Sequence, residues 1–400
     1  MKIRRRLFGL TVSCILFFSG CAPATPYPTG NAYHEGTDFQ YAWTLEGDRI
    51  FTQSEDGYYF VVYQNSGGYL YFTDKTTLQT VPLCSKPNCM HALETDDEKK
   101  DLCDARISPF GALGYIDEKV YYVCNNGPTL DILQINPDGT DRKVLHSLTG
   151  QVPSQQFAFH RGKMYVAVKT YDEDMNVNST VWSYSLRDAS NEPEKLCELP
   201  TSKGSIDAIY VYGNYLYASG VISSENEYER STIYRLNLSN KKLTAQLELE
   251  EPDTTWCANF IDGKFMTSAA KSLGAGSFIP DQTTITFYQT DLDGNNQHKW
   301  AELPYSHYTS DNQYLYMWNW PSSDIPMEDK TLTIYDKDAN TVDRLPIGKL
   351  IPNYSEVYVS PGEHVFIYAK DEGMYAFPKS EIGSGNITPV QILEIPDETA

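Results

Sequence analysis

The chain has 400 residues, with 32 Lys and Arg against 53 Asp and Glu and a formal net charge of −21. So acidic a chain repels the phosphates of nucleic acid, because binding to them requires a basic face, and this excludes nucleic acid as a partner. Its 30 tyrosines suit half-buried β-strands better than helices.

The first 20 residues have the order of a secretory signal. Basic residues at positions 2 and 4–6 precede an apolar run over 7–18, and small residues then lead to Cys21. The alternative is an uncleaved membrane anchor, but the run is shorter than the roughly 20 residues of a spanning helix. We therefore predict a signal peptide over 1–20, and the mature chain keeps 28 basic and 53 acidic residues, a charge of −25.

This signal resembles that of a bacterial lipoprotein. Ser19, Gly20 and Cys21 stand where such signals carry their lipobox. The resemblance implies cleavage before Cys21, attachment of acyl chains to its thiol and amine, and a lipid-anchored protein on the extracytoplasmic face of the cell membrane. Residues 21–38, rich in Pro, Thr and Gly, are predicted to be a flexible tether between the membrane and the domain.

From about residue 40 the sequence repeats one pattern, a polar turn followed by a strand rich in Tyr, Val, Ile and Phe. Examples are "SEDGYYFVVY", "FHRGKMYVAV" and "FIDGKFMTSA", and each is followed by further strand-like runs such as "STIYRLNL" and "LTAQLEL". Alignment of the repeats places these residues at one position: Phe60, Tyr121, Tyr165, Tyr217, Met266, Tyr316 and Phe366. Their separations are 61, 44, 52, 49, 50 and 50 residues.

Repeats of about 40 to 50 residues with four strands each are typical of β-propeller blades. We predict an all-β chain whose residues 39–396 form a β-propeller of seven blades, each with four antiparallel strands. Six or eight blades remain the alternatives, because the segment "FQYAWTLEGDRIF" has an ambiguous role and could supply a strand that closes the ring against the last blade.

The Asp-Gly turns in "NPDGTDRKVL" and "DLDGNNQHKW" resemble TolB-like propeller repeats. Together with the signal and the Cys/His stretch below, they resemble a family of bacterial surface lipoproteins known mainly as a domain of unknown function. The resemblance covers most of residues 55–395. It implies a propeller and no established reaction.

A Cys/His stretch, "PLCSKPNCMHALETDDEKKDLCDA", falls where the first repeat is longer than the others. We predict an insertion over 84–113, outside the repeated core. Its candidate metal ligands are Cys84, Cys89, His91 and Cys103. Lys86, Pro87 and Asn88 form a good turn that could bring the first two thiols together. Three thiolates and one imidazole would make a closed tetrahedral site for a structural zinc ion.

A disulfide within this set is the rival interpretation, because secretion places the thiols outside the reducing cytoplasm. Such a bridge would close a loop of under about 20 residues and stabilise the fold by about 3 kcal/mol. The remaining cysteines, Cys124, Cys197 and Cys257, lie in separate strand-like runs and are expected to be buried thiols. Sequence cannot choose among the pairings.

The anchor, the charge and the aromatic cluster "YMWNWP" favour a binding or protein-interaction module at the cell envelope, with an envelope protein, peptide or glycan as ligand. Trp318 and Trp320 are the candidate ligand-binding residues if their rings are exposed, and blade packing is the other interpretation. The alternative function is an enzyme that processes envelope or extracellular polymers, a hydrolase or lyase with its site in the propeller channel. No catalytic motif nominates residues for it.

Overall fold

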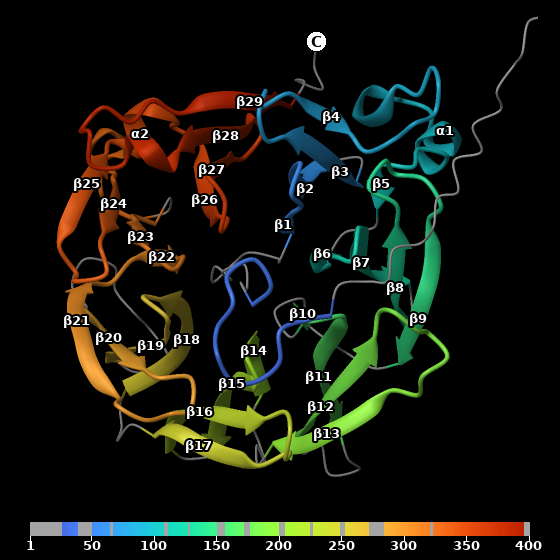
Figure 1. Cartoon of the computed structure of the whole chain (residues 1–400). Coiled ribbons are helices and arrows are strands. Elements are labelled where there is room, and N and C mark those ends of the chain that lie inside the picture. The colour runs from blue at the N-terminus through green and yellow to red at the C-terminus, as the bar shows by residue number, and fades with distance from the viewer. Residues whose placement is uncertain are drawn as a thin grey trace, which may run out of the picture.

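The computed structural model is a ring of seven β-sheets around a central axis (Figure 1). The structure describes residues 26–38, 50–64, 67–107, 111–126, 129–149, 157–171, 177–199, 205–224, 227–248, 253–271, 284–320 and 323–395. Among these residues no helix is long and apolar enough to cross a bilayer. The signal peptide and Cys21 lie outside the described residues.

Each sheet is one blade whose strands follow the chain order from the axis outward. Blade 1 holds β1 (Phe51–Gln53), β2 (Gly57–Gln64), β3 (Gly67–Asp74), β4 (Thr80–Pro82) and β5 (Arg106–Ile107). Blade 2 holds β6 (Leu113–Ile116), β7 (Lys119–Asn126), β8 (Thr129–Ile135) and β9 (Lys143–Thr149). Blade 3 holds β10 (Phe157–His160), β11 (Lys163–Tyr171), β12 (Val177–Ser185) and β13 (Glu194–Leu199).

Blade 4 holds β14 (Ser205–Tyr212), β15 (Tyr215–Ser224), β16 (Glu227–Asn237) and β17 (Leu243–Glu248). Blade 5 holds β18 (Asp253–Ile261), β19 (Lys264–Lys271), β20 (Thr284–Thr290) and β21 (His298–Pro304). Blade 6 holds β22 (His307–Ser310), β23 (Leu315–Trp318), β24 (Leu332–Tyr335) and β25 (Thr341–Leu345). Blade 7 holds β26 (Tyr354–Val359), β27 (His364–Ala369), β28 (Gly373–Pro378) and β29 (Val390–Glu394). Short helical turns are η1 (His91–Leu93), α1 (Asp97–Asp101), η3 (Met327–Asp329), α2 (Ile347–Leu350) and η4 (Lys379–Glu381).

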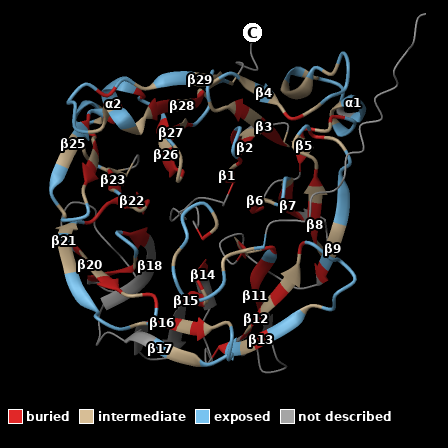
Figure 2. Ribbon diagram, viewed as in Figure 1, coloured by how far each residue is buried: buried red, intermediate tan, exposed pale blue. Residues whose placement is uncertain are grey.

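The seven-bladed prediction is confirmed, and the repeat alignment shows why. All seven aligned residues, from Phe60 to Phe366, lie in the second strand of their blade and are buried. Neighbouring blades pack these strands face to face, so the core forms a ring between sheets. The outer strands are mostly exposed (Figure 2), as the pattern of β21 shows.

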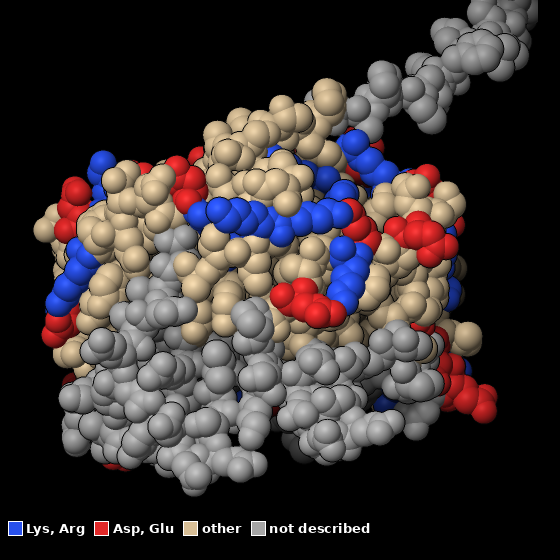
Figure 3. Space-filling model, turned by 90° about the horizontal axis from the view of Figure 1, so that it is seen from below, with Lys and Arg blue, Asp and Glu red and all other residues tan. Residues whose placement is uncertain are grey.

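The rim of the propeller carries paired charges. On the side of β13 and β17, Lys and Arg side chains are interspersed with Asp and Glu (Figure 3). Lys241 contacts Glu194 of the neighbouring blade at 2.5 Å, and Lys195 contacts Glu198 at the same distance. Such exposed pairs contribute little to stability.

Of the segment "FQYAWTLEGDRIF", residues 39–49 lie outside the described residues, and its last residue, Phe51, begins β1. β1 pairs with β2 as the inner strand of blade 1, and the described strands of blade 7 come from residues 354–394. The first and last blades meet through aromatic packing. The ring of Phe366 lies 4.7 Å from that of Phe51 and 4.6 Å from that of Tyr58.

The predicted tether over 21–38 extends too far, because residues 26–38 pack on the propeller. We call residues 26–38 the N-terminal strap. In Figure 1 it is the blue loop that lies across the centre of the ring. The carboxylate of Asp38 is fully buried and accepts hydrogen bonds from Arg161 Nε and Nη2 at 3.0 and 2.9 Å and from the Gly213 amide at 2.8 Å.

The lowered pKa values of two buried histidines indicate that the protein loses stability in acid. Burial lowers the pKa of His160 to about 4, against the opposing effect of Asp38, and burial lowers the pKa of His307 to about 4, from an ordinary value of 6.5. The unfolded chain takes up these protons below pH 6.5 and the folded chain only near pH 4. The stability is therefore complete above pH 6.5 and falls as the pH drops from 6.5 to 4.

His307→Phe keeps the aromatic volume of the ring and removes its titration. We expect the free energy of unfolding to fall by about 2 kcal/mol less between pH 7 and pH 4.5 in this variant than in the parent chain. Urea titrations at the two pH values measure it. His298→Gln, at an exposed histidine in β21, is the control. An equal acid loss in the His307 variant and the parent would contradict the prediction.

Candidate functional site

The fourth strand of blade 1 is split in two. β4 pairs with β3 over Tyr71, Phe72 and Thr73, and β5 pairs with the same edge of β3 at Gly68 and Tyr69. Residues 83–105 leave the sheet between these two pairings and return to it. The predicted insertion over 84–113 therefore ends earlier than expected, since Leu113 already belongs to blade 2, and it interrupts a strand rather than joining two blades.

The excursion over 83–105 is ordered by local hydrogen bonds. The turn after Lys86 uses Asn88 at a φ of 61°, a left-handed conformation that asparagine tolerates. The side chain of Asp96 caps α1 by accepting hydrogen bonds from the amides of the second and third helical residues. Lys86 Nζ lies 2.7 Å from Asp104, so the start of the excursion contacts its end.

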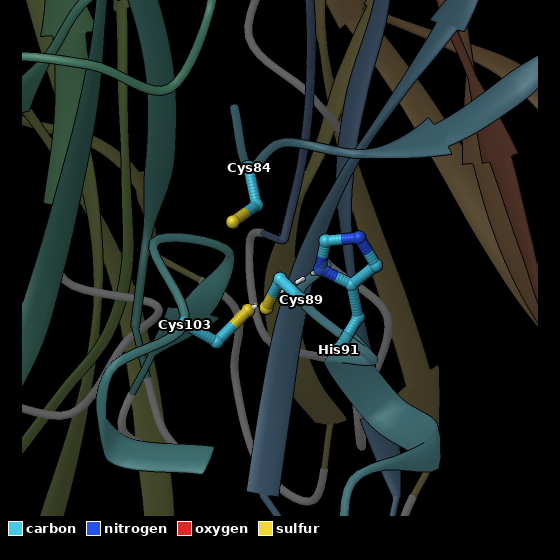
Figure 4. A group of neighbouring side chains, drawn as sticks. All are labelled: Cys84, Cys89, His91 and Cys103. Atoms are coloured by element: carbon cyan, nitrogen blue, oxygen red, sulfur yellow. Dashed lines mark hydrogen bonds between the residues drawn. The ribbon is translucent and has the colours of Figure 1, made fainter. Parts of the chain in front are cut away.

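The four predicted ligands converge at the base of this excursion (Figure 4). One ligand atom from each of Cys84, Cys89, His91 and Cys103 lies within 4.8 Å of the other three. Cys84 follows β4 and Cys103 precedes β5, so the cluster joins the two halves of the split strand. A tetrahedral zinc with bonds of about 2.3 Å to sulfur sets the sulfurs about 3.8 Å apart, which this cluster accommodates with little movement.

His91 is oriented for this cluster. Its Nδ1 lies 3.5 Å from Cys103 Sγ (Figure 4). Its backbone has a φ of 53°, in the left-handed region that costs a side-chain-bearing residue about 1 to 3 kcal/mol. This conformation places the imidazole on the side of the thiols. A disulfide would give no reason for a histidine to be held there.

The electrostatics of the cluster favour a cation. Burial, with a smaller contribution from the neighbouring thiols, raises the pKa of Cys103 to about 12. Burial also raises the pKa of Cys84, but hydrogen bonds from the backbone of Lys86 and Asp104 outweigh it and leave that pKa lowered. Burial lowers the pKa of His91, so its imidazole is neutral and able to bind a metal. A bound cation would displace the thiol protons that burial otherwise retains.

Two further described cysteines lie outside the cluster, Cys124 in β7 and Cys197 in β13. Cys84, Cys89, Cys103 and Cys197 are free thiols. Cys124 is buried, as expected, whereas Cys197 is half-buried. Cys257 lies in β18, and its side chain is outside the described part of the structure.

The two candidate ligand-binding tryptophans lie inside blade 6. Trp318, at 0% exposure, is the last residue of β23 and packs in the core between blades 6 and 7, so its ring is not available at the surface. Trp320 is half-buried, and its ring centroid lies 3.8 Å from that of His307. The geometry of Trp318 therefore corresponds to blade packing, because β23 is buried along its whole length.

A second candidate site lies at the mouth of the central channel, and sequence reasoning missed it. A cavity of about 420 Å³ opens between the N-terminal strap and the inner strands of blades 1, 2 and 3. Its lining includes the rings of Tyr115 and Phe159, the amide of Gln53, the ammonium of Lys75 and Thr37 of the strap. These five residues come from five separate segments, so no local motif could reveal them.

The architecture and the cluster define a class, a seven-bladed β-propeller protein with a Cys3His cluster on the rim of its first blade. No protein-family model matches the chain, and no curated protein sequence is similar to it. Among solved structures, a prolyl endopeptidase superposes with a TM-score of 0.55 over 86% of this chain at 13% identity. An oligogalacturonate lyase in complex with manganese gives 0.51 over 88% at 10%, and TolB from Acinetobacter baumannii gives 0.42 over 72% at 13%.

These comparisons show the fold alone. This chain spans about half of the endopeptidase, 48%, together with 99% of the lyase and 62% of TolB. The neighbours include enzymes as well as TolB, and one propeller architecture carries many functions. The predicted propeller is confirmed, and membership in a particular lipoprotein family stays a prediction.

Proposed function

We propose that this protein is a lipid-anchored, extracytoplasmic binding module of the bacterial cell envelope. The cavity at the channel mouth is the observation that carries the binding role. Its volume of about 420 Å³ is within the range of sites for small ligands, about 300 to 1,000 Å³. The resemblance of Ser19, Gly20 and Cys21 to a lipobox supports the anchor.

The lining fits a sugar unit or a peptide side chain. Tyr115 and Phe159 offer ring faces for stacking, and Gln53 and Lys75 offer polar groups. Lys75 is held in place because its Nζ donates to the Glu55 carbonyl at 3.3 Å. Rigid aromatic walls with a few fixed polar groups are the usual composition of such sites.

Binding of residues 22–400 to a glycan array and a peptide library tests this function. Tyr115→Leu should lower the affinity for a captured ligand by about two- to ten-fold, because it removes one aromatic stacking contact. Tyr184→Leu, at a half-buried tyrosine of β12 outside the cavity, should leave the affinity unchanged. No captured ligand, or equal affinities in both variants, would contradict the binding role. Turnover that one carboxylate substitution abolishes would support the polymer-processing enzyme instead.

We also infer that Cys84, Cys89, His91 and Cys103 hold a structural zinc ion. The donor set is one that zinc prefers, and four protein ligands fill its tetrahedral shell. The cluster lies at the rim, whereas the cavity lies at the axis. We therefore assign the metal to holding the split strand together rather than to chemistry on a ligand.

A further inference from the structure

We propose that the N-terminal strap fixes the orientation of the propeller at the membrane. The face that carries the strap and the cavity beneath it would lie toward the bilayer, and the other end of the channel would point away from it. This inference rests on the proposed lipid anchor at Cys21. It adds to that anchor a definite orientation of the ring.

The strap lies on one face because its described contacts are made at one end of the blades. Each blade of this ring joins its first strand to its second at the same end of the channel, and its third to its fourth at that end also. Asp117 is in such a turn of blade 2, Arg161 in blade 3 and Gly213 in blade 4. The strap contacts all three, so it runs across several blades at one end of the axis.

The first contact of the strap is at Tyr27. Its hydroxyl donates to Asp117 Oδ1 at 2.8 Å, and the guanidinium of Arg187 lies 4.3 Å from its ring centre. Arg187 also pairs with Asp117 at 2.5 Å. One residue of the strap is thereby fixed to the turns of two blades.

The central contact is the buried carboxylate of Asp38. Arg161 binds it through two nitrogens and also donates to the carbonyls of Gly30 and Ala32 at 3.2 and 3.3 Å. The amides of His34 and Gly213 donate to Asp38 Oδ2 at 3.1 and 2.8 Å. Breaking a buried pair of this kind is strongly destabilising, because it leaves a charge without a partner.

The strap also reaches blade 5 and presses closely on blade 4. The ring of Tyr33 stacks on that of Phe260 at a centroid distance of 4.0 Å. Gly213 has a φ of 54°, and a Cβ placed on it would lie 2.4 Å from the carbonyl oxygen of Asn31. The strap backbone therefore fits only against a glycine there.

The length of free chain decides whether this docking sets an orientation. An extended chain spans at most about 3.6 Å per residue, so the five steps from Cys21 to residue 26 reach about 18 Å. A tether free up to residue 38 would reach about 60 Å and allow any face to approach the membrane. With the strap docked, only the strap face can lie that close.

A matched pair of glycine substitutions separates docking from backbone strain. Gly213→Ala places its methyl group against Asn31, whereas Gly263→Ala, in the corresponding turn of blade 5, meets nothing within 4 Å. Both glycines have positive φ, 54° and 73°, so both variants carry similar strain. In residues 22–400, we expect amide exchange over 26–38 to be at least about ten-fold faster in the Gly213 variant and unchanged in the Gly263 variant.

The orientation is measured by fluorescence energy transfer from a fluorescent donor on the protein to acceptor lipids. The sample is the full lipidated chain bound to vesicles that contain these lipids. The donor is placed by genetic encoding at exposed Asn296, in a turn on the strap face, or at exposed Thr284, at the opposite end of β20. The seven residues of β20 separate these ends by about 20 Å. Transfer should be higher from position 296, and Gly213→Ala should abolish the difference while Gly263→Ala keeps it.

Equal transfer from the two positions in the membrane-bound parent chain would overturn the orientation and leave the anchor standing. A chain whose Cys21 carries no lipid, shown by intact mass and by its absence from the membrane fraction, would overturn both. Fast exchange over 26–38 in the parent chain would overturn the docked strap by itself. Glycan and peptide binding by the soluble domain is independent of the first two outcomes, because the cavity needs the docked strap but no membrane.

Discussion

Cys103→Ser should release the metal from the rim cluster and loosen residues 83–105, while the rest of the ring stays folded. The loop between β4 and β5 would lose its closure, and a closed loop of about 20 residues is worth about 3 kcal/mol by chain entropy. We expect the free energy of local unfolding of residues 83–105 to fall by this amount. Amide exchange and limited proteolysis over 83–105 measure it.

Cys197→Ser is the matched control, because Cys197 is a half-buried free thiol far from the cluster in the chain. Elemental analysis should give one zinc per parent chain and per Cys197 variant, and none for the Cys103 variant. A parent chain that lacks zinc and gains two hydrogen atoms in mass on reduction would contradict the metal and establish the disulfide.

Phe366→Ala should destabilise the whole propeller by about 3 to 5 kcal/mol, the usual cost of removing a buried aromatic ring. Phe366 is fully buried where blade 7 meets blade 1, in contact with Phe51 and Tyr58. No described strand is shared by these two blades, which meet through side chains, among them Phe366 and the hydrogen-bonded pair of Tyr58 and His364. Urea unfolding followed by far-ultraviolet circular dichroism measures the free energy.

Val390→Ala tests the same blade at its outer edge. Val390 is 56% exposed in β29, so its truncation should change the free energy of unfolding by no more than about 0.5 kcal/mol. If the two variants were equally stable, the packing between blades 1 and 7 would not be what closes the ring.

The blades could be predicted from the sequence because their core is periodic. Each blade buries its second strand on both faces, so each repeat needs a large apolar residue at the same place, and Phe60, Tyr217 and Phe366 report that place. The ligand cluster could also be predicted, since Cys84, Cys89 and His91 are close in sequence and Cys103 is the next cysteine. Both predictions rested on the spacing of residues along the sequence.

The strap and the cavity could not be predicted from the sequence because their contacts join distant single residues. Asp38 binds Arg161, 123 positions away, and neither residue belongs to a repeating pattern. The proline and threonine residues near Asp38 in the sequence suggested a free tether. Such a composition does not reveal that the carboxylate of Asp38 is buried. Trp318 was misleading for a related reason, since an aromatic cluster in sequence does not say whether its rings face solvent or the next blade.

The route of the chain into blade 1 determines where a mechanical load would act. A pull on the N-terminal end of the described chain first meets Tyr27, Asp38 and Tyr33, which grip the turns of blades 2 to 5. These contacts resist together as shear, and β1 lies behind them in the chain. Tension applied at this end would therefore be borne by the middle of the ring, and the seam between blades 1 and 7, which no described strand crosses, would be spared.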